Sequence, residues 1–469
     1  MQTKNIFRAS QVILLAFGHF TVDLYAGFLP VMVPVLQQAL GFSIAHAAVL
    51  ISVFSLSTSL FQCFSGYVFD RWRDTRLMMM APLVAGICMS CLGIASSFFG
   101  LILLLMIGGI SIAFFHPQGA ALVSFLSGPR HSIGMSIFVT GGTVGVATGS
   151  LLASVLVEAF GLSGPIYGIA FGGLMSYGLW WRMNHLVPTE MKSMMQLQEK
   201  NKGPGYGRLV VWVILAATKA FIILGCLTFV PFYIIHEGNS LHTVGVTLFV
   251  FGLAGGVGGL TGGSWAERIG ERRVLIASFL LPAPLLSLYL LLGSSVTGIV
   301  CFGLTGYWLY SGVPILLSAC QRNFPGRVGV TSSLVMGLSW GLAGLGISPA
   351  GIIAEKVGLG DALWGLVLIA LVGVVLAYLI LWMTFLDVAL SGNKSKKGLV
   401  EEVFPTSHDE AASSGRNFLR IHFMASSSSP TFRRMQPRKK IQRPKRTEVR
   451  IPNRLHGKVC WGSLKISHW

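Results

Sequence analysis

Two ionisable residues, His19 and Asp23, stand in the apolar segment GHFTVDLYAGFLPVMVP, residues 18 to 34. Because they are four positions apart, they share one face of a helix. A charged side chain at the centre of a bilayer costs about 2.5–3.5 kcal/mol on insertion scales. A carboxylate and an imidazole can both bind and release protons, so this pair predicts a proton-handling site inside a membrane.

A third charge, Lys219, lies in another apolar segment. A rise of about 1.5 Å per residue puts His19 about 12 Å and Asp23 about 18 Å into a core about 30 Å thick, and Lys219 at about 15 Å. Matching depth predicts that Asp23 and Lys219 meet in a hydrated interior. Two interpretations stay open. In the first, Asp23 and Lys219 form a structural ion pair that holds the two halves together. In the second, protonation of Asp23 or His19 alternates with binding of the substrate, and Lys219 binds an anionic group of that substrate.

His116 precedes Pro117, which removes a backbone donor and loosens its helix. His116 is expected nearer the cytoplasmic end of its segment, either as a structural histidine or as part of a proton relay. Since the estimated depths differ and no HExxH spacing occurs, no metal and no cofactor are predicted. Four more residues are candidates for lining a pore, with packing or interfacial anchoring as the alternative: Gln62, Gln118, Tyr25 and Tyr310.

The composition describes a membrane protein. Of 469 residues, 53% are hydrophobic and 11% charged, and the mean hydropathy is +0.69. A soluble domain carries roughly 25% charged residues, so that class is excluded. The formal charge of +18 is concentrated in the tail, where residues 388–469 hold 17 Lys and Arg against 5 Asp and Glu.

Apolar runs of about 20 residues predict an all-α polytopic protein with twelve transmembrane helices. The expected spans are 11–36, 46–69, 77–96, 99–124, 131–157, 165–186, 209–235, 243–264, 274–293, 296–320, 328–354 and 362–386. With a cytoplasmic N-terminus, the inner connections carry nearly all the basic residues, and the outer ones carry only Lys356. This asymmetry follows the positive-inside rule and predicts a multi-pass plasma (inner) membrane protein with both termini cytoplasmic.

An internal repeat divides the spans six and six around a polar linker, 187–208. GYVFDR (66–71) matches GSWAER (263–268) at an offset of 197. The matched residues are Gly66 with Gly263, Asp70 with Glu267, and Arg71 with Arg268. Two pseudo-symmetric six-helix bundles, 1–186 and 209–387, are therefore predicted, with a substrate site between them. The loop charges are either simply solvated or form a conformational switch; recurrence in both halves favours the switch.

These motifs resemble the major facilitator superfamily, whose fold would be the 6+6 bundle. GHFTVDLY, FFHPQGAAL and GPRHSIGMSIFVTGGTVG resemble more narrowly its fosmidomycin-resistance efflux branch. The resemblance covers about residues 10–386. The loop DRWRDTR departs from the usual pattern, with Arg73 in place of glycine, and the fifth helix lacks the Gly-Pro pair common in antiporters. Its glycines are Gly141, Gly142, Gly145 and Gly149.

The resemblance implies a secondary active transporter and no enzyme, with proton-coupled efflux of a small, fosmidomycin-like or other anionic drug that confers antibiotic resistance. The alternatives are a non-coupled facilitator, an uptake symporter of a small metabolite and, more remotely, a membrane-embedded enzyme. The expected partners are a small-molecule substrate, protons and the lipid bilayer. No specific nucleic acid is expected, and the protein is expected to be a monomer.

The C-terminal tail, 388–469, is predicted to be disordered. Its segment SSSSPTFRRMQPRKKIQRPKR (426–446) is rich in Ser, Pro and Arg and too polar to form a core. Such a tail could contact anionic lipid or, nonspecifically, nucleic acid, and no function is assigned to it.

Overall fold

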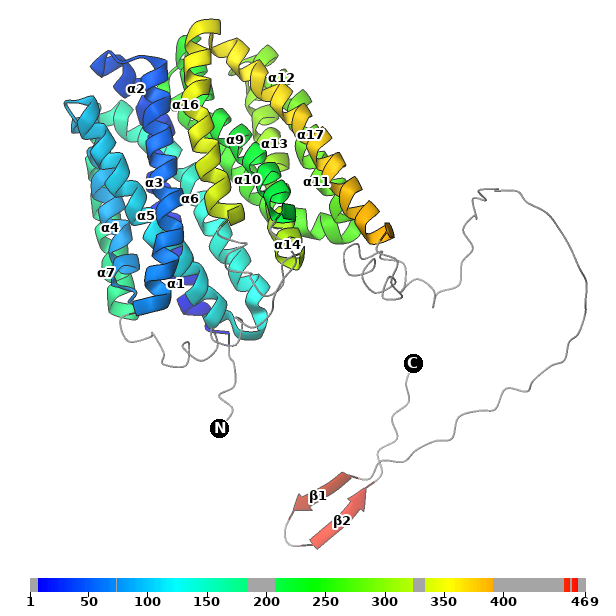
Figure 1. The fold of residues 1–469 in the computed structure, drawn as a ribbon. Helices are drawn as coiled ribbons and strands as arrows, with labels where there is room; N and C mark the ends of the chain where they lie inside the picture. Colours follow the sequence, from blue (N-terminus) through cyan, green and yellow to red (C-terminus); the bar gives the residue numbers. More distant parts are fainter. Residues whose placement is uncertain are drawn as a thin grey trace, which may run out of the picture. The chain divides into compact units, whose positions relative to one another are not determined.

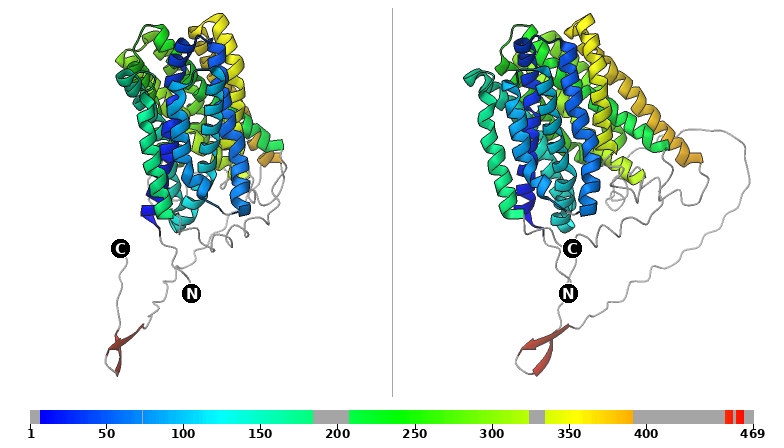
Figure 2. Two further views of the ribbon diagram at one scale, coloured as in Figure 1. Left: turned by 90° about the vertical axis from the view of Figure 1, so that its left-hand side faces the viewer. Right: turned by 60° about the vertical axis from the view of Figure 1, so that its left-hand side comes forward.

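The computed structural model describes residues 7–72, 74–183, 207–323 and 334–390, and two strands within 451–462. Residues up to 411 form one compact unit, and residues 412–469 form a second. The first unit is all helical, and its long helices run side by side along one axis (Figures 1 and 2).

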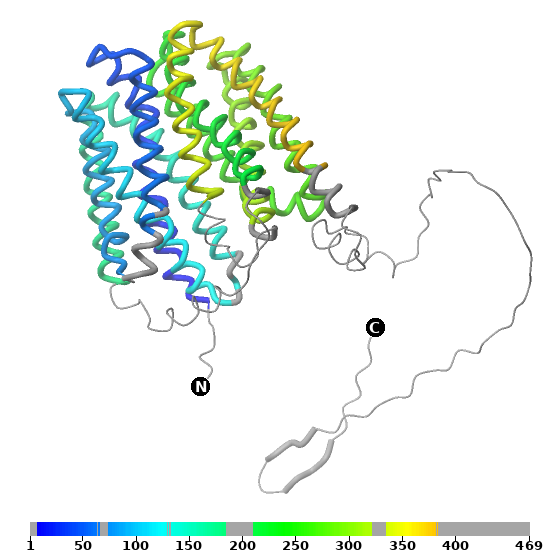
Figure 3. Tube along the Cα trace, viewed as in Figure 1, coloured from blue at the N-terminus to red at the C-terminus, as the bar shows by residue number. Residues whose placement is uncertain are grey.

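The N-terminal half contains seven α-helices joined by short 3₁₀ turns. They are α1 (Ala9–Ala26), α2 (Phe28–Leu40), α3 (Ile44–Trp72), α4 (Arg76–Ser90), α5 (Phe98–Ser127), α6 (His131–Phe160) and α7 (Ile169–Met183). The turns are η1 (Cys91–Ile94), η2 (Gly128–Arg130) and η3 (Gly164–Gly168). At Gly27 the chain stays in the helical region, so α1 and α2 form one span, Ala9–Leu40. Figure 3 follows the chain through the bundle in the same view as Figure 1.

The C-terminal half repeats this plan with more interruptions. Its α-helices are α9 (Gly207–His236), α10 (Leu241–Ile269), α11 (Glu271–Leu280), α12 (Pro282–Leu292), α13 (Val296–Ser311), α14 (Val313–Asn323), α16 (Ser339–Val357) and α17 (Leu359–Leu390). A single π-helical turn, η4 (Leu334–Leu338), precedes α16. Such turns are rare and frequently lie at functional sites.

Eleven stretches of the described residues are long and apolar enough to cross a membrane. The remaining expected span, 165–186, corresponds to η3 and the 15-residue α7, which is described only as far as Met183. Apolar side chains such as Trp181 and Leu291 are 72% and 74% exposed, as expected of a surface that faces lipid. Twelve spans are therefore not confirmed, although all eleven stretches match predicted ones.

The two halves meet along two pairs of helices, α3 with α16 and α6 with α10. The contacts are close near the end of the bundle where α3 and α10 begin, which we call the far end. There Ser52 Oγ donates to the Gly344 carbonyl at 2.6 Å. Further along α10 the contact with α6 loosens: a Cβ at Gly256 would lie 3.6 Å from Thr143, whereas a Cβ at Gly263 would meet no atom within 4 Å. This conformation is closed at the far end.

The second unit contains a two-stranded antiparallel hairpin, β1 (Ile451–Leu455) with β2 (Lys458–Gly462). The predicted disorder of the whole tail is therefore not confirmed. The last helix of the C-terminal half, α17, continues to Leu390, three residues past the expected end of that half at residue 387. The rest of the predicted tail and most of the linker 187–208 lie outside the described residues.

Candidate functional site

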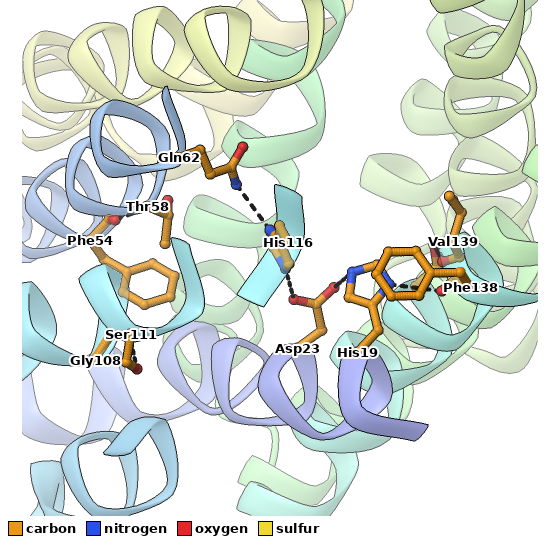
Figure 4. A network of polar contacts seen from close by, with 11 residues as sticks. His19, Asp23, Phe54, Thr58, Gln62, Gly108, Ser111, His116, Phe138 and Val139 are labelled. Atoms are coloured by element: carbon orange, nitrogen blue, oxygen red, sulfur yellow. Dashed lines mark hydrogen bonds and ion pairs between the residues drawn. The ribbon is translucent and has the colours of Figure 1, made fainter. Parts of the chain in front are cut away.

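The centre of α1 carries a chain of polar contacts that reaches three other helices (Figure 4). Asp23 Oδ2 lies 3.2 Å from His19 Nε2, and Asp23 Oδ1 lies 3.0 Å from His116 Nε2 on α5. The side chains of His19, Asp23 and His116 are 11%, 15% and 25% exposed. Each oxygen of a carboxylate in the membrane interior thus faces an imidazole nitrogen, and the contact with His116 is a hydrogen bond, which offsets part of the desolvation cost.

Each histidine has a second partner that fixes its ring. His19 Nδ1 lies 2.7 Å from the Phe138 carbonyl oxygen on α6, and its ring stacks on the Phe138 ring at 4.2 Å. His116 Nδ1 lies 2.9 Å from Gln62 Nε2 on α3. The four side chains and one carbonyl form a single chain across α6, α1, α5 and α3.

The glycines of α6 allow α1 to come this close. A Cβ at Gly141 would lie 2.6 Å from the Ala16 carbonyl oxygen, and Cβ atoms at Gly145 and Gly149 would clash with the Phe20 and Leu24 carbonyls. These glycines therefore seat α1 on α6 within one half. Gly142 has a different neighbour, because its Cβ would press on His19 and Asp23. Sequence reasoning noticed the glycine spacing but missed this contact.

The structure corrects the predicted position of His116. It does lie in the second half of α5, toward the end expected to be cytoplasmic, but it was also expected at a depth different from that of His19 and Asp23. Instead α5 crosses α1 at this level, and one ligand-type atom from each of the three residues lies within 4.8 Å of the others. The predicted difference in depth therefore does not exist, because a depth estimate ignores where a helix begins and how it tilts.

The predicted meeting of Asp23 and Lys219 is also wrong for this conformation. Lys219 Nζ donates to the Ser278 carbonyl at 3.0 Å and to Ser278 Oγ at 2.8 Å, and it lies 3.8 Å from the centre of the Phe279 ring. The side chain is 1% exposed and extends within the C-terminal half to α11. Among the described residues, the ion pairs of Asp23 involve histidines only. The estimate that Lys219 and Asp23 lie at equal depth gives no information on side-chain direction, and the Lys219 side chain points toward α11.

The four predicted pore-lining residues have different environments. Gln62 joins the polar chain, whereas Tyr310 on α13 packs against the Phe251 ring on α10, with 6.2 Å between the ring centres. Gln118 is fully buried and donates to Ser65 Oγ at 3.4 Å. Tyr25 is also fully buried and donates to the Gly168 carbonyl at 2.6 Å. Gln118 and Tyr25 are thus packed between helices in this conformation, so Tyr25 is not at an interface; a role of either residue in lining a pore stays a prediction.

The predicted switch loops are only partly described. Gly66, Asp70 and Arg71 lie in the last turns of α3, and their side chains lie outside the described residues. Glu267 and Arg268 are exposed in the last turn of α10, just before Gly270, whose φ of +93° ends the helix. Their role as a switch stays a prediction.

Comparison with known proteins identifies the family. The sequence profile described as the Major Facilitator Superfamily matches residues 15–349. This chain belongs to that superfamily. It is therefore a multi-pass membrane transporter rather than an enzyme, and it moves a small molecule.

Two curated relatives cover most of the superfamily region. The chain is 26% identical over 352 residues to the fosmidomycin resistance protein of Escherichia coli (strain K12), which covers 73% of this chain and 85% of that protein. It is 24% identical to the MFS-type transporter YfnC of Bacillus subtilis (strain 168), over 79% of this chain and 92% of that protein. A shorter match, 26% over 31% of this chain, is to the multi-drug resistance efflux pump PmrA of Streptococcus pneumoniae, 38% of which it covers.

Solved structures share the fold. A bacterial homologue of the human lysosomal transporter Spinster superposes with a TM-score of 0.62 at 16% identity, over 80% of this chain and 97% of that chain. A POT family transporter in complex with 5-aminolevulinic acid superposes with a TM-score of 0.63 at 13% identity, over 79% and 95%. The predicted all-helical fold of the superfamily is thus confirmed, whereas its division into twelve spans is not.

Proposed function

We propose that this protein is a proton-coupled antiporter that exports a small drug-like molecule by alternating access, with His19, Asp23 and His116 as the coupling site. The single observation that carries the proposal is the chain from the Phe138 carbonyl through His19, Asp23 and His116 to Gln62, inside the helix bundle. It combines a carboxylate with the side chain whose charge changes near neutral pH. It also touches the helix that contacts the other half, since Gln62 is on α3.

Two kinds of observation support efflux as the direction. The relatives that carry a functional name are a fosmidomycin resistance protein and a multi-drug resistance efflux pump. The positive-inside pattern supports a cytoplasmic N-terminus, and this conformation, closed at the far end, would then face the cytoplasm. A site open to the cytoplasm is where an exporter loads its substrate.

The anionic character of the substrate has less support than the sequence suggested. Lys219 was the proposed anion-binding group. In this conformation its ammonium group instead donates a hydrogen bond to Ser278 and lies over the ring of Phe279. We keep a fosmidomycin-like molecule as the first substrate to test, because of the named relative, and treat its charge as an experimental variable.

Transport in vesicles tests the coupling. Inverted vesicles containing the protein are given a pH gradient, and substrate accumulation is compared for Asp23→Asn and for Asp361→Asn, a matched change at the exposed start of α17. We expect Asp23→Asn to remove accumulation driven by the gradient and Asp361→Asn to keep it. Undiminished accumulation by Asp23→Asn would contradict the proposed site. If the unmodified protein transports the substrate at the same rate with and without the pH gradient, it is a non-coupled facilitator.

A further inference from the structure

The Phe138 carbonyl determines which nitrogen of His19 bears hydrogen. A carbonyl oxygen only accepts, so Nδ1 is the donor in the 2.7 Å contact. Nε2 is then the atom that faces Asp23 Oδ2 at 3.2 Å. A neutral His19 would turn an unprotonated nitrogen toward a carboxylate oxygen, and two acceptors cannot form a hydrogen bond. One proton must therefore lie between His19 Nε2 and Asp23 Oδ2.

His116 needs no such additional proton. Gln62 Nε2 donates to its Nδ1 at 2.9 Å, so the ring hydrogen is on Nε2, which donates to Asp23 Oδ1 at 3.0 Å. A neutral His116 therefore satisfies both of its contacts.

We propose that the exchangeable proton is bound between His19 Nε2 and Asp23 Oδ2, and that His116 and Gln62 are positioning residues that hold the carboxylate. Only the exchange rests on the proposed function. With the proton bound, His19 is an imidazolium beside a carboxylate and the pair is neutral. When the proton leaves for water, His19 keeps its Nδ1 hydrogen, Asp23 stays ionised, and the pair has a charge of −1.

Among the described residues, the groups in contact with this pair come from two neighbouring helices. His116 on α5 contacts Asp23. On α6, the Phe138 carbonyl and ring are the neighbours. Since none of these supplies a second fixed positive charge, the leaving proton must be replaced by another donor. The part of a substrate that takes its place therefore donates a hydrogen bond or carries a positive charge; a phosphonate would have to bind elsewhere.

Nitrogen NMR of the full-length protein labelled with ¹⁵N-histidine tests the location of the proton without any substrate. Spectra at pH 7 are assigned by comparison with His19→Gln and His116→Gln. We expect both nitrogens of His19 to be protonated and His116 to be neutral with its proton on Nε2. A neutral His19, or an imidazolium at His116 instead, would overturn the proposal. If His19 is an imidazolium but transport ignores the pH gradient, the proposed antiport fails while the proton site stands.

Gln62→Glu tests the positioning role in the same spectra. A carboxylate in place of the amide accepts from Nδ1, so His116 should then become an imidazolium as well. Gln62→Leu removes the donor to Nδ1, so the single tautomer of His116 should become a mixture. A His116 signal that neither change alters would show that Gln62 has no influence on it.

A separate observation concerns the helix starts at the far end. Ser43 Oγ accepts from the His46 N–H at 3.4 Å at the start of α3, and Ser240 Oγ accepts from the Thr243 N–H at 3.2 Å at the start of α10. Each serine satisfies one of the N–H groups that a helix start leaves unpaired. The two serines are 197 positions apart, the offset of the internal repeat.

A glutamate from the opposite half accepts from the neighbouring N–H at each helix start. Glu355 Oε2 at the end of α16 accepts from Ala45 N at 3.1 Å, and Glu158 Oε1 at the end of α6 accepts from His242 N at 2.7 Å. Both donors and both acceptors are again separated by 197 positions. A carboxylate beside a helix start is favoured by the helix dipole as well as by the hydrogen bond.

We infer that Glu158 and Glu355 are reciprocal latches that hold the far end closed, each half supplying one carboxylate and one helix start. Opening of the far end must break both contacts, because each joins helices of different halves. The carboxylates are exposed, so the helix starts can be solvated by water after the contacts break.

Distance measurements between spin labels at Gln38 and Lys356, two exposed positions, one in each half at the far end, test the latches. We expect Glu158→Ala with Glu355→Ala to shift the distribution toward longer distances, and the double Gln variant, which keeps an acceptor, to shift it less. Glu237→Ala, which removes an exposed carboxylate at the same end, is the matched control. A distribution as short in the double Ala variant as in the control would overturn the inference.

Discussion

At the scale of single residues, the site depends on the lack of a side chain at Gly142. A Cβ there would lie 2.5 Å from His19 Nε2. Space for the hydrogen-bonded pair is thus provided by a glycine on a neighbouring helix, which no pattern of ionisable residues could indicate.

Gly142→Ala should therefore disturb the pair. Inserting a methyl group into a packed interior costs typically about 1–3 kcal/mol, and here the atoms that must move are those of His19 and Asp23. We expect a lower thermal unfolding temperature and a loss of gradient-driven accumulation. Gly173→Ala is the control, because its Cβ would make an ordinary contact with Leu83 at 3.8 Å. Equal behaviour of the two variants would show that the pair tolerates the displacement.

Lys219 has a structural explanation at this scale. Gly312 interrupts the span formed by α13 and α14. A Cβ at Gly312 would lie 3.2 Å from Lys219 Cε and would clash with Ser278 Oγ. The lysine side chain therefore passes beside this glycine to reach Ser278 on α11. The ammonium group therefore ties α9 to α11 across the interruption.

Ser278→Ala removes the hydroxyl that accepts from this lysine. A hydrogen bond to a charged group contributes about 1.5–3 kcal/mol, so we expect a destabilisation of that size in thermal unfolding. The dependence of transport on the pH gradient should not change. Ser287→Ala is the control, since that hydroxyl only donates to the carbonyl of Ala283 in its own helix. A loss of gradient dependence in Ser278→Ala would instead give Lys219 a role in coupling.

At the scale of elements, α6 has two functions on two faces. One face seats α1 through Gly141, Gly145 and Gly149, and the other meets α10 of the opposite half, where Gly252 lies against Ala147. A change in the position of α1 can thus reach the contact between the halves through a single helix.

Gly145→Ala tests the first of these faces. Its Cβ would clash with the Phe20 carbonyl, so we expect a destabilisation of about 1–3 kcal/mol as α1 and α6 separate. Gly178→Ala, whose added Cβ would meet no side chain or neighbouring helix within 4 Å, should gain about 0.8–1.0 kcal/mol from helix propensity. Thermal unfolding in detergent compares the two, and a stable Gly145→Ala would mean that α1 can shift without cost.

The sequence predicted the membrane spans well, but it did not predict which way the polar side chains point within the bundle. Hydropathy predicted segments near all eleven described spans, because an apolar length is a local property. It missed that His116 reaches Asp23 and that Lys219 turns to Ser278, because both depend on helix rotation and crossing. The Phe138 carbonyl carries no sequence signal, since every residue has a carbonyl group.

At the scale of the whole molecule, most of the basic tail, residues 412–469, forms a unit separate from the one that contains the transport helices. Deletion of residues 395–469 should leave transport intact, because the hydrogen-bonded chain of the candidate site lies wholly before residue 140. Transport rate per molecule in vesicles, corrected for the amount inserted, is the measurement. A truncated protein that inserts normally but does not transport would assign the tail a function.

The two glutamate contacts at the far end have a practical consequence. Because each half supplies one such contact, a variant that lacks one carboxylate still has the other contact. The effect of a single substitution on transport is then expected to be small. A survey that alters one position at a time would pass over both residues, and only pairwise substitution would expose them.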